Sequence, residues 1–313
     1  MRYLVTGAAG FLGTNLCLNL LEDGNEVVGL DNLSTGFSRN LELLKKNPDF
    51  SFVQHDVVLP LPGLGEFSFF YNLACPASPP RYQKDPLQTF RTSIWGAWNA
   101  IEYVRKTGTP LFHTSTSEVY GDPSVHPQKE TYWGNVNPIG IRACYDEGKR
   151  GAEAMLSDYF RASGNPIKIV RIFNTYGPHM DPSDGRVISN FLNQAIEGKP
   201  LTIYGDGTQS RSFCYVSDLI AGMRRMEKSP AEFIGPVNIG NPTEFTLLEL
   251  IDSIESVLGK KPEVEFLPLP GDDPKQRRPD ISLAKEKLNW EPKVQLKEGL
   301  GKTLSYFREI REG

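Results

Sequence analysis

The sequence predicts an α/β protein in which helices cover both faces of a parallel β-sheet, followed by a smaller C-terminal domain. Short, almost wholly apolar segments alternate with longer helical stretches through the first half of the 313-residue chain. Strands that are buried on both faces have such near-continuous apolar sequences. A glycine-rich segment, residues 7–13, also separates the first strand from the first helix.

The expected elements follow in order along the chain. Strands are expected over residues 3–6, 26–30, 51–54, 69–74, 110–114 and 167–173. Helices are expected over residues 11–22, 86–106, 145–162, 187–197, 216–228, 246–258 and 297–311. After residue 173 the elements shorten, and proline and glycine become more frequent. We therefore expect a sheet domain, residues 1–173, and a smaller domain, residues 174–313, partly interleaved with the first.

Composition excludes several classes of partner. The net charge of −4 argues against binding nucleic acid or an anionic membrane through bulk charge. No apolar run reaches the roughly 18 residues of a transmembrane helix, and the first strand begins without a leader, so we expect a cytoplasmic protein. We expect neither a metal site nor a disulfide, because the cysteines and histidines are isolated from one another: Cys17, Cys75, Cys144, Cys214, His55, His113, His126 and His179.

The glycine-rich segment has the spacing of a dinucleotide-binding turn. Gly7 allows a sharp turn, Gly10 lets a pyrophosphate approach the backbone, and Gly13 lets the helix pack close to the strand. Asp31 ends the second strand, where a carboxylate can accept a hydrogen bond from a ribose 2′-hydroxyl and repels a 2′-phosphate. A plain turn is the alternative for the glycines alone. Strand, glycines, helix and carboxylate together favour NAD and a Rossmann doubly wound sheet.

Tyr145 and Lys149 are four residues apart on an expected helix, and so they share one face. A lysine ammonium one turn away stabilises a phenolate and lowers the tyrosine pKa from about 10 toward neutrality, which makes a general base. A surface pair on an amphipathic helix has the same spacing. Four hydroxyl residues, 114–117, lie where the fifth strand ends. Among them we expect Thr116 to hydrogen-bond the oxygen that Tyr145 deprotonates.

With these motifs the chain resembles the extended short-chain dehydrogenase/reductases and, within them, the UDP-glucuronate decarboxylases (UDP-xylose synthases). The likeness covers nearly all of the chain. It is strongest in the stretches HTSTSEVYGDPSVHPQ (113–128), YWGNVNPIGIRACYDEGKR (132–150), IFNTYGP (172–178), DGRVISNF (184–191) and DDPKQRRPDI (272–281).

The resemblance implies roles for individual residues. Those implied to hold or approach NAD are Gly7, Gly10, Phe11, Leu12, Asp31, Asn32, Thr35, Gly36, Asp56, Val57, Leu73, Thr92, Tyr145, Lys149, Thr175 and Arg186. Those implied to contact the UDP-sugar are Tyr82, Glu118, Tyr145, Asn174, Tyr204, Arg211 and Arg277. The implied catalytic set is Thr116, Glu118, Tyr145, Lys149 and Arg277. Arg277 is the best candidate to meet the sugar carboxylate or the diphosphate, and the sequence leaves the neighbouring Arg278 open as the alternative.

The activity implied is conversion of UDP-glucuronate to UDP-xylose and carbon dioxide. Tyr145 deprotonates the C4 hydroxyl while hydride passes to bound NAD. The 4-ketone then accepts the electron pair as carbon dioxide leaves, and the hydride returns to C4. Glu118 is expected to serve the chemistry at C5 and C6.

Four other functions are weighed against this one. Nucleotide-sugar 4,6-dehydratases carry an Asp-Glu pair where this chain has Ser117 and Glu118, and UDP-galactose 4-epimerases usually lack the carboxylate. An oxidative decarboxylase that releases UDP-4-keto-pentose and NADH is a closer alternative. A non-catalytic NAD-sensing regulator is a further one, although such proteins tend to lose the tyrosine or the lysine.

The resemblance also implies a homodimer, in which helices 86–106 and 145–162 pair into a four-helix bundle. The first of these helices offers five large apolar side chains, Ile94, Trp95, Trp98, Ile101 and Tyr103. The alternative is that all five face the sheet of their own chain.

Overall fold

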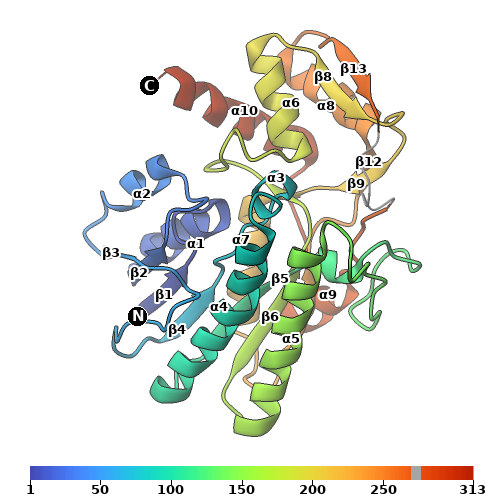
Figure 1. The fold of residues 1–313 in the computed structure, drawn as a ribbon. Helices are drawn as coiled ribbons and strands as arrows, with labels where there is room; N and C mark the ends of the chain where they lie inside the picture. Colours follow the sequence, from blue (N-terminus) through green and yellow to red (C-terminus); the bar gives the residue numbers. More distant parts are fainter. Residues whose placement is uncertain (269–275, 313) are drawn as a thin grey trace.

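A computed structural model describes residues 1–268 and 276–312 and contains a central sheet of seven parallel strands (Figure 1). The strand order is β11-β6-β5-β4-β1-β2-β3, and it reverses between β1 and β4. This reversal makes the sheet doubly wound, and ligands of such sheets bind beyond the carboxyl ends of the strands. The strands are β1 (Arg2–Thr6), β2 (Glu26–Asp31), β3 (Phe50–Gln54), β4 (Phe69–Asn72), β5 (Leu111–Thr116), β6 (Ile167–Ile172) and β11 (Val237–Ile239).

Helices cover both faces of this sheet. One face carries α1 (Phe11–Glu22), α2 (Ser38–Leu44), α7 (Val216–Glu227) and α9 (Ser282–Leu288), and the other carries α4 (Pro86–Thr107) and α5 (Ala143–Ser163). Along β1, Tyr3 and Val5 belong to one buried cluster and Leu4 belongs to the other. Successive side chains of a strand point to opposite faces, so one short strand contributes to two cores.

Helices α4 and α5 lie side by side against the same face of the sheet (Figure 1). The side chain of Asp85 caps α4 by accepting from the N–H of Gln88 at 3.0 Å. Gly108 and Gly164 end the two helices in the left-handed conformation that favours glycine.

A C-terminal lobe lies over the carboxyl end of the sheet, at the top of Figure 1. We use this name for α6 (Val187–Glu197), β8 (Leu201–Tyr204), β9 (Ser210–Ser212), β12 (Glu244–Thr246), α8 (Leu247–Leu258), β13 (Val264–Leu267) and α10 (Leu296–Glu312). Within it β8 pairs with β13, and β9 pairs with β12. Four short elements complete the fold, α3 (Pro79–Tyr82), η1 (Ser117–Tyr120), β7 (Thr175–Tyr176) and β10 (Cys214–Tyr215).

The predicted α/β fold with a parallel sheet is confirmed, and the six expected strands and seven expected helices all form close to their predicted bounds. The sequence did not indicate β11, because three residues are too few to show a strand pattern. Strand β11 lies beyond residue 173 and joins the sheet by pairing with β6. The division at residue 173 itself stays a prediction.

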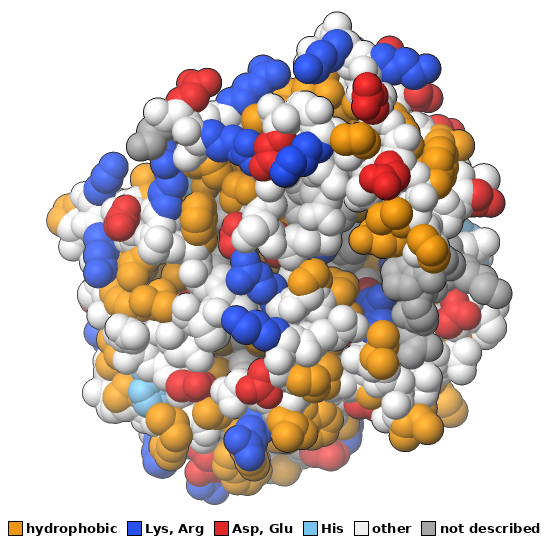
Figure 2. Space-filling model, turned by 45° about the horizontal axis from the view of Figure 1, so that its top comes forward, with side chains coloured by type: hydrophobic (Ala, Val, Ile, Leu, Met, Phe, Trp, Pro, Cys, Tyr) orange, Lys and Arg blue, Asp and Glu red, His pale blue; other side chains and the backbone are white. Residues whose placement is uncertain are grey.

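The face of the molecule seen in Figure 2 intersperses basic, acidic and apolar side chains. Within the part of the chain that the structure describes, no helix combines the length and apolar character needed to cross a membrane.

Candidate active site

A cavity of about 710 Å³ lies between the carboxyl ends of β4, β5 and β6 and the C-terminal lobe. It brings together predicted residues that are far apart in the sequence. Those that line it are Leu12, Leu73, Tyr82, Thr116, Glu118, Tyr145, Lys149, Asn174, Thr175, Arg186, Tyr204, Arg211 and Arg277. The whole predicted catalytic set is therefore at one place.

The glycine turn beside this cavity fits the diphosphate of a dinucleotide. Gly7 has a φ of +72°, and a Cβ added at Gly13 would lie 2.0 Å from the Gly7 carbonyl oxygen. Helix α1 begins after Gly10, and no described side chain caps its first turn. Its N–H groups are thus available to an anion that approaches the bare backbone.

The other predicted NAD residues lie along the ends of β1, β2 and β3 and on α4. The carboxylate of Asp31 accepts from the N–H of Ala9 at 3.0 Å and of Leu33 at 2.8 Å. Burial raises the pKa of Asp31, and these backbone hydrogen bonds oppose the shift. Asn32 donates to Asp56 at 3.1 Å. Residues of this group outside the cavity lining are Gly7, Gly10, Phe11, Asp31, Asn32, Thr35, Gly36, Asp56, Val57 and Thr92.

Tyr145 lies in the first turns of α5, buried beside Thr116 at the end of β5. Burial raises the pKa of the Tyr145 phenol, and a hydrogen bond with Thr116 opposes the shift. The spacing of Tyr145 and Lys149 predicted a lowered pKa for the Tyr145 phenol. For the chain without a bound ligand, this direction is wrong. Lys149 Nζ donates to the Thr114 carbonyl at 2.8 Å and lies 6.0 Å from the centre of the Tyr145 ring. Desolvation of the phenol is therefore the larger effect.

Glu118 lies in η1, the turn that follows β5, and its carboxylate is held between two arginines. Its Oε2 atom lies 2.6 Å from Arg142 Nη2 and 3.0 Å from Arg277 Nη2. Arg277 is 2% exposed and also donates to the Ser117 carbonyl. Burial alone would raise the pKa of Glu118, but the guanidinium charges of Arg277 and Arg142 lower it below its ordinary value. The site therefore contains an ionised carboxylate that is paired with two arginine side chains.

Sequence reasoning missed Arg142 and Asp146. Arg142 lines the cavity, and its place three residues before Tyr145 was the one available signal. Asp146 is buried next to Tyr145, and its Oδ1 atom has no hydrogen-bond partner among the described residues. Burial and the nearby Glu118 charge raise the pKa of Asp146 to about 7. Two neighbouring carboxyl groups thus have pKa values shifted in opposite directions.

The C-terminal lobe supplies the far wall of the cavity. Asn174 follows β6, whereas Tyr204 ends β8 and Arg211 lies on β9. The adjacent arginines Arg277 and Arg278 differ in position. Arg277 lines the cavity, whereas the side chain of Arg278 is 40% exposed and lies 3.6 Å from Glu244.

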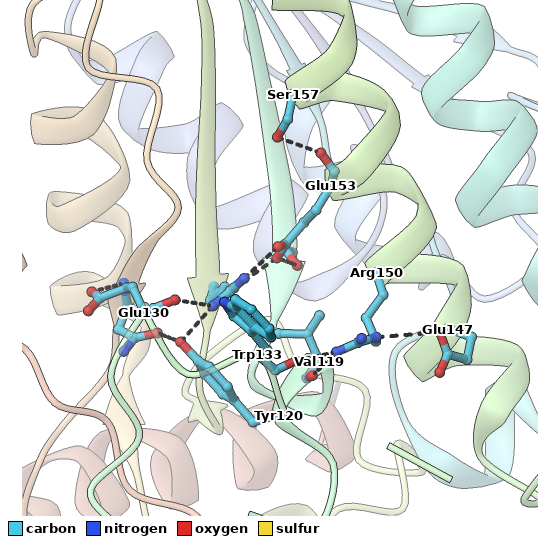
Figure 3. Close-up of polar contacts among 11 residues, drawn as sticks. Val119, Tyr120, Glu130, Trp133, Glu147, Arg150, Glu153 and Ser157 are labelled. Atoms are coloured by element: carbon cyan, nitrogen blue, oxygen red, sulfur yellow. Dashed lines mark hydrogen bonds and ion pairs between the residues drawn. The ribbon is translucent and has the colours of Figure 1, made fainter. Parts of the chain in front are cut away.

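A buried polar network supports η1 from behind (Figure 3). Arg171 on β6 contacts both carboxylate oxygens of Glu153, at 2.9 and 2.7 Å, and lies 3.0 Å from the Tyr120 hydroxyl. That hydroxyl donates to Asn238 at 2.7 Å. Arg150 on α5 donates to the Val119 carbonyl at 3.0 Å. These contacts fix the end of β5 and η1, which carry Thr116 and Glu118.

The doubly wound sheet, the glycine turn and the tyrosine–lysine helix agree with a family model. The model of the NAD dependent epimerase/dehydratase family matches residues 3–240, and the chain belongs to this family.

Within that class, the chain is similar to proteins of one particular name. UDP-glucuronic acid decarboxylase 1 of Arabidopsis thaliana is 52% identical over 308 residues, which make up 98% of this chain and 70% of that protein. UDP-glucuronic acid decarboxylase 1 of Danio rerio is 49% identical over 310 residues, 99% of this chain and 73% of that one. A crystal structure of UDP-glucuronic acid 4-epimerase from Bacillus cereus with UDP-glucuronic acid and NAD is also similar, with a TM-score of 0.86 and 30% identity over 99% of this chain and 100% of that one.

Proposed function

We propose that the chain is a UDP-glucuronate decarboxylase, an NAD-dependent carboxy-lyase that converts UDP-glucuronate to UDP-xylose and carbon dioxide. One observation carries the proposal. The same cavity holds a proton-transfer group, Tyr145 with Thr116 and Lys149, and an ionised Glu118 beside Arg277. Oxidation of a hydroxyl requires the first group alone. The similarity to UDP-glucuronic acid decarboxylases supports the assignment.

The residues fit NAD in the orientation that the glycine turn favours. Gly7, Gly10 and the start of α1 would hold the diphosphate, Asp31 the adenosine ribose, and Tyr145 and Lys149 the nicotinamide end. Bound NAD⁺ supplies the oxidant for C4 and a positive ring charge that favours the phenolate of Tyr145.

Tyr145 serves as the base at the first step and as the acid at the last. Its phenolic oxygen takes the proton from the C4 hydroxyl as that carbon is oxidised, and it returns a proton when the ketone is reduced. Thr116, at the end of β5, orients the C4 oxygen through its hydroxyl. The Lys149 ammonium, which is held by the Thr114 carbonyl, provides the compensating charge.

Loss of carbon dioxide occurs from the 4-keto sugar. The bond between C5 and C6 breaks, its electron pair passes to the ketone as an enolate, and a proton then adds at C5. Arg277 pairs with the sugar carboxylate and holds it for cleavage. Glu118 orients the ring at C5 and accepts or delivers the proton there through water.

Incubation of the purified protein with UDP-glucuronate and NAD, followed by mass spectrometry and NMR of the nucleotide sugars, tests the proposal. UDP-xylose with no net NADH is the expected outcome. UDP-4-keto-pentose with one NADH per turnover would assign an oxidative decarboxylase instead. UDP-galacturonate would indicate an epimerase, and binding of both ligands without turnover would indicate an NAD-sensing regulator.

We further infer a homodimer formed through α4 and α5. Trp95 and Trp98 support it, because they are 47% and 50% exposed on the outer face of α4. Ile94 is half-buried, whereas Ile101 and Tyr103 are buried in the core under the sheet, so the face offers fewer apolar side chains than expected. A cytoplasmic location stays a prediction from the sequence.

A further inference from the structure

Two guanidinium groups share one oxygen of Glu118, and they reach it from different parts of the fold. Arg277, buried at 2% exposure, also donates to the carbonyl of Ser117, so it joins Glu118 to η1 itself. Arg142 immediately precedes α5, and its carbonyl accepts from the backbone N–H of Tyr145 at 3.0 Å. Arg142 therefore joins Glu118 to the helical turn that carries the proposed base.

We propose that Arg142 is the positioning residue of Glu118, and that its direct contact keeps this carboxylate anchored and charged once Arg277 pairs with the carboxylate of the substrate. The proposal rests on the proposed function, since it assigns the sugar carboxylate to Arg277. It assigns to Arg142 a role toward Glu118 and none toward the substrate.

The reason is electrostatic. The Glu118 side chain is 17% exposed, and a carboxylate with so little water around it retains its charge only beside a cation. A substrate carboxylate that binds Arg277 competes for the guanidinium that Glu118 now shares. Arg142 lies closer to Oε2, at 2.6 Å, and a guanidinium does not lose its own proton in the physiological range. Glu118 can then remain a proton acceptor during the step at C5.

Other charged or titratable groups face Glu118 besides Arg142 and Arg277. Tyr82 comes from α3, Tyr145 and Asp146 come from α5, and Arg211 comes from β9. Of the two arginines with a direct contact to Oε2, Arg142 is the one that adjoins the helix of Tyr145, directly before its first residue. A loss at Arg142 should therefore change the titration of Glu118 without removing the residue proposed for the sugar carboxylate.

Arg150 provides a matched control. It lies eight residues further along α5 and donates to the carbonyls of Val119, at 3.0 Å, and Trp133, at 2.6 Å (Figure 3). It thus supports the same η1 segment as Arg142 through backbone oxygens, its ion pair at 3.4 Å is with Glu147 and not with Glu118, and it is absent from the cavity lining. Arg150→Gln tests what loss of structural support alone does to turnover.

The experiment compares Arg142→Gln, Arg142→Lys and Arg150→Gln in the full chain with NAD, measuring kcat and KM for UDP-glucuronate from pH 5 to 9. For Arg142→Gln we expect kcat to fall about 100-fold, KM to change less than about threefold, and the acid limb of kcat to move up by about one pH unit. Arg142→Lys should recover at least tenfold of kcat, because it restores the charge. Arg150→Gln should leave the acid limb in place. The double variant Glu118→Gln/Arg142→Gln should be no slower than Glu118→Gln, because both remove one function.

A second measurement is independent of turnover. In NMR spectra of protein labelled with ¹³C-glutamate, the signal of Glu118 is identified as the one that is lost in Glu118→Gln. Its shift with pH reports the pKa of Glu118. The Tyr145→Phe background prevents UDP-glucuronate from reacting during the titration. Addition of UDP-glucuronate should raise this pKa in Arg142→Gln/Tyr145→Phe by at least one unit more than in Tyr145→Phe. An equal rise in both, an acid limb that moves equally in Arg150→Gln, or a rise in KM with unchanged kcat would overturn the proposal. Absence of UDP-xylose from the wild-type protein would refute the proposed function, while the titration would still decide the role of Arg142.

Discussion

Tyr82 stacks flat against Tyr145, with ring centroids 5.1 Å apart and ring planes within 4° of parallel. Tyr82 comes from α3, the short helix after β4, whereas Tyr145 comes from α5. Tyr82 is 1% exposed, and its hydroxyl is buried without a hydrogen-bond partner among the described residues. The ring of Tyr82, and not its hydroxyl, therefore orients the proposed base.

This contact predicts opposite results for two substitutions of Tyr82. Tyr82→Phe keeps the ring and removes an unpaired buried hydroxyl, so stability should be unchanged or rise by about 1 kcal/mol, with kcat within about threefold of wild type. Tyr82→Ala should cost about 3–5 kcal/mol and lower kcat further, because Tyr145 loses the ring packed on it. Urea unfolding and steady-state kinetics check both variants. Strong destabilisation by Tyr82→Phe would show that the hydroxyl has a partner.

Tyr145→Phe should bind NAD and UDP-glucuronate almost normally and yet lose turnover by about 10²–10⁴-fold. The change deletes one hydroxyl and leaves the stacking on Tyr82 in place. Isothermal titration calorimetry measures binding, and product analysis measures turnover. Lys149→Met should reduce turnover similarly and also weaken NAD binding. Near-native turnover by Tyr145→Phe would contradict the assignment of the base.

Glu118→Gln should bind substrate but form UDP-xylose at least 100-fold more slowly, since it keeps the size of the side chain and removes its charge. Oxidation at C4 needs Tyr145, Thr116 and NAD, so a single-turnover measurement at 340 nm should still show NADH appear. Adding Ser117→Asp should not restore xylose formation. If Glu118→Gln made UDP-xylose at the wild-type rate, Glu118 would be structural.

Asp146 predicts a specific dependence of stability on pH. Its pKa is about 7 in the folded chain and near 3.8 when unfolded, so the folded state holds the extra proton between these values. The stability that this proton contributes is fully present below about pH 4 and is lost as the pH rises through 7. Asp146→Asn, which does not titrate, should match wild type at about pH 3.5 and exceed it at pH 8 by roughly 1–3 kcal/mol. Denaturant unfolding at the two pH values is the measurement, and an equal difference at both would contradict the assignment.

The outer face of α4 predicts the assembly state. Trp95→Asp/Trp98→Asp should sediment as a monomer at micromolar concentration, while the wild type sediments as a dimer, because two charges would replace the apolar centre of the interface. Phe266→Asp, an equally exposed aromatic position on β13 at 57% exposure, is the control and should stay dimeric. A wild-type monomer would refute the homodimer.

The sequence predicted the helices and strands well where a hydrophobic pattern extends over many residues or where close packing requires a glycine. Helix α5 and strand β5 form at their expected places, and Gly13 is required because a Cβ there would overlap the Gly7 carbonyl. These features depend on local sequence, and this explains why patterns reveal them.

Features that depend on tertiary contact were not predictable. The guanidinium of Arg142 reaches Glu118 only because the segment after η1 folds back to α5. The pKa of Tyr145 is raised and not lowered as predicted. The spacing of two residues indicates that a lysine is near, but it does not indicate how deeply the tyrosine is buried. The pKa values of Glu118 and Asp146 shift in opposite directions for the same reason. Arginine contacts lower the pKa of Glu118, whereas desolvation raises the pKa of Asp146.

The pairing of β11 with β6 bears on how the protein recognises its ligands. The chain leaves the sheet after β6, builds α6, β8 and β9, returns as β11, and departs again to β12 and α8. Arg211 lies on β9, before β11, and Arg277 lies after it. The chain therefore passes between the sheet and the C-terminal lobe several times, and the two walls of the cavity are not joined by a single hinge. Much of the conformational entropy of aligning those walls is consequently lost when the chain folds, before any nucleotide sugar arrives, and such preorganisation favours tight association.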